Sequence, residues 1–191
     1  GLLLDSSPLP ETILKTNILG LDLIPANGEL EQAEQMLPVH LNFTTRLREA
    51  VQAIKQMAYD VVLIDCPPSL GAITTNAITA AHLLIIPTQA EYFSAYALRN
   101  MMGTIRRIRQ EVNPGLAYRI LVTLLDRRNR THRNIFEQLQ STFGQGVFTT
   151  VIEIDTKLRE SPIAGIPITH YKPNSRGSQQ YRVLAQELID Y

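Results

Sequence analysis

The amino-acid sequence predicts an α/β fold of the doubly wound type, in which helices flank a mostly parallel sheet. Short apolar runs alternate with longer segments of helical period along the whole chain. Residues 61–64 are apolar at every position, which is typical of a parallel strand covered on both faces. The chain has 191 residues, 45% of them apolar, and no repeat or linker, so we expect one domain over residues 1–191.

Asn27 and Asn42 are candidate N-caps, because each precedes a segment with apolar residues at helical spacing. Leu98, Met101, Ile105 and Ile108 are expected on the inner face of one long helix, and Tyr181, Leu184 and Leu188 on that of the last helix. The expected strands lie at residues 21–24, ended by Pro25, then at 61–64, at 83–86, stopped by Pro87, and at 120–124 and 147–154. The expected helices lie at residues 29–37, 43–54, 74–81, 92–110, 131–143 and 178–189.

Composition and charge exclude several classes of protein. The single cysteine, Cys66, excludes an intrachain disulfide framework and a multi-cysteine metal centre built by one chain. No apolar run approaches the roughly 20 residues that a membrane helix needs, and no signal-peptide pattern is present, so we expect a cytoplasmic protein. The net charge is zero but unevenly spread: residues 1–98 carry four basic against ten acidic residues, and residues 99–133 carry nine arginines against two acids. Such a chain can present a basic face to a polyanion.

The strongest chemical signal lies between Asp65 and Gly71. Ligands of open α/β sheets bind beyond the carboxyl ends of the strands, where Asp65 is expected. In phosphoryl-transfer NTPases an aspartate at this place helps to hold Mg²⁺, often through water, and a glycine N–H in the next loop lies close to the terminal phosphate. Asp65 and Gly71 fit these two roles, while Pro67 and Pro68 fix the chain direction. An aspartate that simply ends a buried strand, followed by a Pro-Pro turn, explains the same residues equally well.

The segment Asp65-Cys66-Pro67-Pro68-Ser69-Leu70-Gly71 strongly resembles the Walker B and switch II segment of ParA-type ATPases, the deviant-Walker family that segregates plasmids and chromosomes. The resemblance continues in the family's order through nearly the whole chain. It covers Leu23-Ile24-Pro25-Ala26, Ile86-Pro87-Thr88-Gln89-Ala90-Glu91-Tyr92, Thr123-Leu124-Leu125-Asp126-Arg127-Arg128, the segment at 158–167, and Pro173-Asn174-Ser175-Arg176-Gly177.

This resemblance implies a P-loop NTPase-like fold and, in the complete protein, Mg-ATP binding, a homodimer that sandwiches nucleotide, and nonspecific DNA binding. The residues that it implies for the cofactor are Asp65, Pro68, Gly71, Thr123 and Asp155, with Mg²⁺ held by Asp65 through water. It places Arg128 and Lys157 on DNA and Ser69 and Glu91 at the dimer interface. Read without the resemblance, the arginines 106, 107, 109 and 127–133 are equally a solvated helix face and loop, and Glu91 an ordinary surface acid. Glu153 departs from the pattern, since the family usually has proline there.

The sequence contains no Gly-x-x-x-x-Gly-Lys-Ser/Thr phosphate loop. In the family this loop, the first switch and the catalytic aspartate lie upstream of the matching region. We therefore expect an N-terminally truncated ParA-like protein that has no catalytic residue of its own and binds ATP poorly. The four histidines show no ligand spacing with one another or with Cys66.

The resemblance implies a role in chromosome or plasmid partitioning, or in positioning another cargo, with a ParB-like activator and a nucleoid-associated, cytoplasmic location. A degenerate, non-enzymatic binding module is the alternative that the missing phosphate loop favours. A MinD-like membrane ATPase would need a basic amphipathic C-terminal helix, whereas the sequence from Ala185 onward is acidic.

Overall fold

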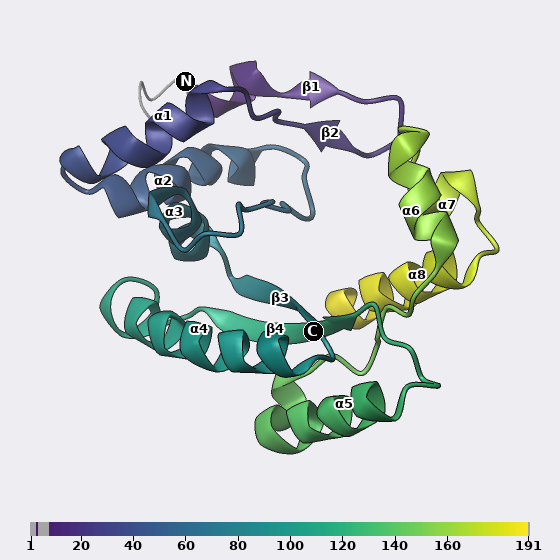
Figure 1. The fold of residues 1–191 in the computed structure, drawn as a ribbon. Coiled ribbons are helices and arrows are strands. Elements are labelled where there is room, and N and C mark those ends of the chain that lie inside the picture. Colours follow the sequence, from purple (N-terminus) through teal and green to yellow (C-terminus); the bar gives the residue numbers. More distant parts are fainter. Residues whose placement is uncertain (1–2, 4–7, 191) are drawn as a thin grey trace. The chain divides into compact units, whose positions relative to one another are not determined.

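The computed structural model describes residue 3 and residues 8–190, which divide into two compact units (Figure 1). The first unit comprises residues 1–82 and 107–116, and the second comprises residues 83–106 and 117–191. None of the helices in this described part of the chain is long and apolar enough to cross a membrane.

The first unit is mainly helical. A small apolar cluster of Ala33, Leu37 and Ala72, with Phe43 and Ile73 packed against it, holds its helices together. Its elements are η1 (Leu9–Thr12), β1 (Leu14–Lys15), β2 (Asp22–Leu23), α1 (Glu29–Met36), η2 (Leu37–Val39), η3 (Phe43–Thr45), α2 (Arg46–Gln52), η4 (Ala53–Gln56) and α3 (Ala72–Ala80). The expected helices are confirmed, although the second is divided into short α and 3-10 pieces.

Two strand predictions in this unit need correction. Residues 61–64 form no strand, and their side chains are exposed, Val61 by 68% and Leu63 by 81%. A strand requires a hydrogen-bonded neighbour, and no described residue pairs with this segment. The strand expected at 21–24 is only β2, which pairs with β1 as an antiparallel hairpin.

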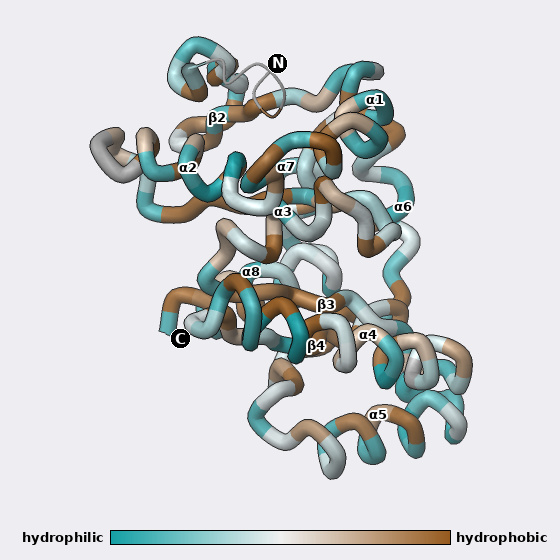
Figure 2. Tube along the Cα trace, turned by 90° about the vertical axis from the view of Figure 1, so that its left-hand side faces the viewer, coloured by the Kyte–Doolittle hydropathy of each residue, from teal (hydrophilic) through white to brown (hydrophobic). Residues whose placement is uncertain are grey.

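The second unit is built on a parallel β-α-β arrangement. β3 (Leu83–Gln89) pairs with β4 (Ala117–Thr123) from Leu83↔Ala117 to Gln89↔Thr123, and α4 (Tyr92–Glu111) connects them. Ile120, Leu121 and Val122 are all buried, so both faces of β4 are covered. Figure 2 shows both strands as hydrophobic. The α/β class with parallel strands and flanking helices is thus confirmed.

Residues 147–154 extend this pairing along β4. Phe148 and Ile152 donate their N–H groups to the carbonyls of Ile120 and Val122, and a parallel bridge joins Leu125 to Glu153. The remaining helices are α5 (Arg130–Phe143), α6 (Thr156–Ile163), α7 (Ile168–Tyr171) and α8 (Arg176–Ile189), with η5 (Gly144–Gly146) after α5. Leu184 of α8 packs with Leu121, Phe148 and Ile152 in the core of the unit.

Three local predictions in the second unit are wrong. β3 continues through Pro87, because a proline is tolerated in a strand that pairs on one side only, as β3 does among the described residues. On α4 the buried methionine is Met102, beside the buried Leu98, whereas Met101 is only half-buried. Tyr181 is 40% exposed, since an amphipathic ring can leave its hydroxyl in water.

Candidate functional site

The loop from Pro67 to Gly71 leads directly into α3 in the first unit. Asp65, just before it, is exposed and has no hydrogen-bond or ion-pair partner among the residues that the structure describes. Pro68 and Ser69 are exposed as well. The loop is tied to the helix by Thr74, whose Oγ1 donates to the carbonyl oxygen of Ser69 at 2.6 Å. The loop therefore presents its side chains to solvent while its backbone is anchored.

An acid from another helix occupies the N-terminus of α3. The carboxylate of Glu34, on α1, accepts the N–H groups of Ala72 at 2.6 Å and Ile73 at 3.0 Å. The first N–H groups of a helix lack partners within the helix and carry partial positive charge, so an anion is stabilised there. The sequence predicts a terminal phosphate near the Gly71 N–H, next to this position. Sequence reasoning missed Glu34, because nothing local links residues that are 38 positions apart.

Gly71 is required by this contact. A Cβ built at Gly71 would lie 1.6 Å from Glu34 Oε1, so any side chain there would displace the carboxylate. The backbone of Gly71 has negative φ, so the reason for glycine is space and not conformation.

Cys66, between Asp65 and Pro67, is half-buried. Burial raises the pKa of its thiol, and the negative charge of Asp65 raises it further. The thiol is therefore protonated near neutral pH and is not an activated nucleophile.

In the second unit the predicted residues lie beyond the carboxyl ends of strands, as the fold rule requires. Thr123 is the last residue of β4, and Glu91 follows β3 and is exposed. Leu124, next to Thr123, has φ +53, an uncommon conformation for a residue other than glycine. Hydrogen bonds from Leu125 to Ile152 and from Ile154 to Leu125 hold this turn in place.

Asp155 connects the N-termini of two helices. Its Oδ1 accepts the N–H of Lys157 in α6 at 2.9 Å, and its Oδ2 accepts the N–H of Gly177 in α8 at 2.8 Å. The hydrogen bond from Gly177 is the main cause that lowers the pKa of Asp155. Both carboxylate oxygens thus already hold backbone N–H groups, and the cofactor role that the resemblance implies for Asp155 stays a prediction.

The two predicted DNA-contacting residues are each paired with an acid. Arg128 Nε and a terminal nitrogen donate to the two carboxylate oxygens of Asp126 at 3.1 and 3.2 Å. Lys157 Nζ donates to both oxygens of Glu160 at 2.8 Å, and Glu160 also accepts the hydroxyl of Tyr171. The ammonium of Lys157 is the main cause that lowers the pKa of Glu160. A phosphate must compete with these carboxylates for both cations.

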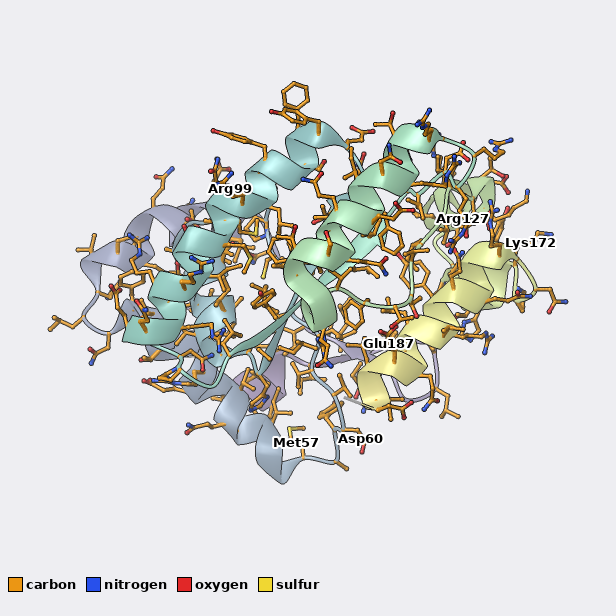
Figure 3. All side chains as sticks on the ribbon, turned by 90° about the horizontal axis from the view of Figure 1, so that it is seen from below. Met57, Asp60, Arg99, Arg127, Lys172 and Glu187 are labelled. Carbon is orange, nitrogen blue, oxygen red and sulfur yellow. The ribbon has the colours of Figure 1, made fainter. Side chains whose placement is uncertain are left out.

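Glu153 forms a third such pairing, which sequence reasoning missed. Its two oxygens accept from Arg127 at 2.6 Å and from Arg176 at 3.0 Å. Figure 3 labels Arg127 on the loop before α5. The sequence shows glutamate at position 153 where the family usually has proline, but it does not show that Arg127 and Arg176 pair with it.

The described residues do not form a complete triphosphate site. The chain has no phosphate loop, and an internal carboxylate lies at the α3 N-terminus. Among the described residues, no group of three His, Cys, Asp or Glu side chains is placed to hold a metal ion.

Comparison with known proteins places this architecture among P-loop NTPases. The fold matches cobyrinic acid a,c-diamide synthase from Mycobacterium smegmatis, solved with a bound ATP analogue and magnesium, at 30% identity and a TM-score of 0.80 over 98% of this chain and 69% of that one. Two curated relatives each cover 98% of this chain. Sporulation initiation inhibitor protein Soj of Bacillus subtilis is 37% identical over 74% of its length, and chromosome partitioning protein ParA of Caulobacter vibrioides is 38% identical over 71%.

A family model described as an AAA domain matches residues 1–118. Together with the identity to Soj and ParA, this match shows that the chain belongs to the AAA domain family and, within it, to the ParA-type ATPases.

A double-mutant cycle tests the Glu34 contact. Glu34→Ala should lower the free energy of unfolding by about 1–2 kcal/mol, because two helix N–H groups lose their acceptor. Gly71→Ala should cost a similar amount by displacing the same carboxylate, and the double variant should be little worse than either single one. Urea unfolding followed by circular dichroism measures all three. Gln35→Ala, at an exposed position on the same helix, is the control and should change little; additive losses would contradict the contact.

Asp155 should make stability depend on acid pH. Its pKa is lowered in the folded chain, so its contribution is complete above the ordinary value of 3.8 and is lost as the pH falls through the lower folded value. Wild type should therefore exceed Asp155→Asn in Tm at pH 7, and the difference should vanish towards pH 2. Thermal melts across this range measure it, with the exposed Asp60→Asn as control. A difference that is the same at every pH would contradict this role.

Proposed function

We propose that this chain acts as a ParA-like protein in chromosome or plasmid partitioning, or in positioning another large cargo. The observation that carries the proposal is its 37–38% identity, over 98% of its length, to Soj and to the chromosome partitioning protein ParA. In the complete protein the proposal includes Mg-ATP-dependent dimerisation, nonspecific binding of DNA at the nucleoid in the cytoplasm, and a ParB-like activator, with residues 1–191 acting as one domain. Ser69 and Glu91, both exposed, are the proposed dimer contacts.

The chain's own residues support part of a nucleotide site. Asp65 is exposed and unpaired within the described residues, so its carboxylate is open to Mg²⁺ and its water ligands. Bound nucleotide would place its terminal phosphate beside Gly71, where the Glu34 carboxylate now holds the first N–H groups of α3. That carboxylate favours the second candidate, a non-enzymatic binding module that uses the same surfaces.

ATP turnover tests the non-enzymatic candidate. We expect the purified 191-residue chain to release no more phosphate from Mg-ATP than its Asp65→Ala variant, because it lacks the backbone N–H groups and the lysine of a phosphate loop. A malachite-green assay with a fluorescent ATP analogue titrated in parallel measures turnover and affinity. Turnover that Asp65→Ala abolishes would show a working ATPase and reject the non-enzymatic module.

DNA binding should respond to the acids that pair with the predicted contact residues. Exposed ion pairs are weak, so each carboxylate should reduce phosphate binding only modestly. Glu160→Gln and Asp126→Asn should each raise the affinity for a 30-base-pair duplex by roughly two- to five-fold, while Lys157→Ala and Arg128→Glu should lower it. Fluorescence anisotropy in 50 mM salt measures these affinities. Affinities that none of the four changes, with no dependence on salt, would remove this surface from the proposal.

A further inference from the structure

The outer face of α4 is basic, and the acid of this helix, Glu111, is its last residue. From Tyr92 to Gln110 the sequence has four arginines and no aspartate or glutamate. Leu98, Met102 and Ile105 form the buried side of the helix. Tyr92, Tyr96 and the four arginines are exposed. Arg99 is labelled on this helix in Figure 3. Part of this helix, up to Arg106, belongs to the second unit, and the inference uses that part alone.

Arg99 and Arg106 differ from Arg127, Arg128, Lys157 and Arg176 of the same unit in having no acid beside them. Neither has an ion-pair or hydrogen-bond partner among the residues that the structure describes, whereas Arg127, Arg128 and Lys157 each hold a carboxylate. Their full charge is therefore available to an outside ligand without loss of an internal pair. Arg128 and Lys157, the predicted DNA contacts, would each have to give up an internal ion pair first.

The spacing of Arg99 and Arg106 puts both on one side of the helix. Seven residues are almost two turns, so the two side chains leave α4 in nearly the same direction, about 10 Å apart along the axis. Tyr92 and Tyr96 lie on the same stripe and add hydroxyl groups. Arginine and tyrosine side chains are among those that contact the phosphates of nucleic acids.

Gly103 lies between the two arginines, four residues after Arg99 and three before Arg106. It is exposed, and a Cβ there would meet no atom within 4 Å, so packing within the chain does not require a glycine. Glycine inside a helix costs about 1 kcal/mol relative to alanine. A smooth surface between the two guanidinium groups is what a closely approaching backbone would need.

We propose that Tyr92, Tyr96, Arg99, Gly103 and Arg106 form a contact surface on α4 for the phosphate backbone of duplex DNA. The inference rests on the proposed function and deepens it by assigning the contact to residues outside the segments that resemble the family's DNA-contacting positions. An acidic protein segment is the competing occupant. We favour DNA because this surface combines positive charge with tyrosine hydroxyl groups and an uncovered glycine. Its two arginines need only evenly spaced negative charges, which a phosphate backbone provides.

The test measures DNA affinity of the full 191-residue chain at several salt concentrations. Arg99→Ala/Arg106→Ala should weaken binding of a 30-base-pair duplex about ten-fold at 50 mM salt and reduce the slope of log affinity against log salt by about two. A charge-matched control on the same unit, Lys172→Ala/Arg182→Ala, should leave the slope unchanged. Gly103→Glu is a second variant that keeps both arginines; its carboxylate lies one turn from each and should also weaken binding, while replacing a glycine with a better helix former keeps the fold.

The outcomes separate this inference from the function on which it rests. Wild-type binding that both α4 variants weaken, and the control does not, supports the surface. Wild-type binding that the α4 variants leave intact overturns the surface but not the proposed function. If the α4 variants keep DNA affinity and lose affinity for poly-L-glutamate, the surface belongs to an acidic protein and the inference is overturned. A wild-type chain that binds no duplex at 50 mM salt overturns both.

Discussion

The parallel pairing of β3 with β4, extended by residues 147–154, is the constraint on which the second unit depends. Parallel strands all end at the same edge, so the loops that follow them are brought together there. Glu91, Thr123 and Asp155 reach that edge from three segments that are far apart in the sequence. The hydrogen bonds from Phe148 and Ile152 to β4 fix the register of residues 147–154 against that strand.

In both units, carboxylates hold several of the positive positions. Glu34 and Asp155 accept helix N–H groups, while Asp126, Glu153 and Glu160 hold arginine or lysine side chains. Helix N-termini and cations are the usual places where phosphate binds, so in this chain internal acids stand where phosphates would bind. An anionic ligand must replace an internal contact at each of these places, whereas on α4 it need not.

The sequence predicted the second unit better than the first. Burial on both faces of a strand leaves a continuous apolar run, and a buried helix face leaves apolar residues at helical spacing, so β3, β4, α4 and α5 were found within a few residues. The same apolar signal failed at residues 61–64, because it reports what a strand would bury and not whether a neighbour is present to pair with it. Among the candidate site residues, Asp65 and Gly71 were singled out from motif order, and their roles stay predictions. Glu34 and the partners of Glu153 were not, since contacts across tens of residues leave no mark on local spacing.

The double role of Asp155 has a consequence for the motions of the second unit. The carboxylate of Asp155 accepts N–H groups from the first turns of both α6 and α8. If this side chain rotates away, both turns therefore lose an acceptor at once. The two helix starts therefore form one cooperative element for local opening, and the amide protons of Lys157 and Gly177 share a single protecting group.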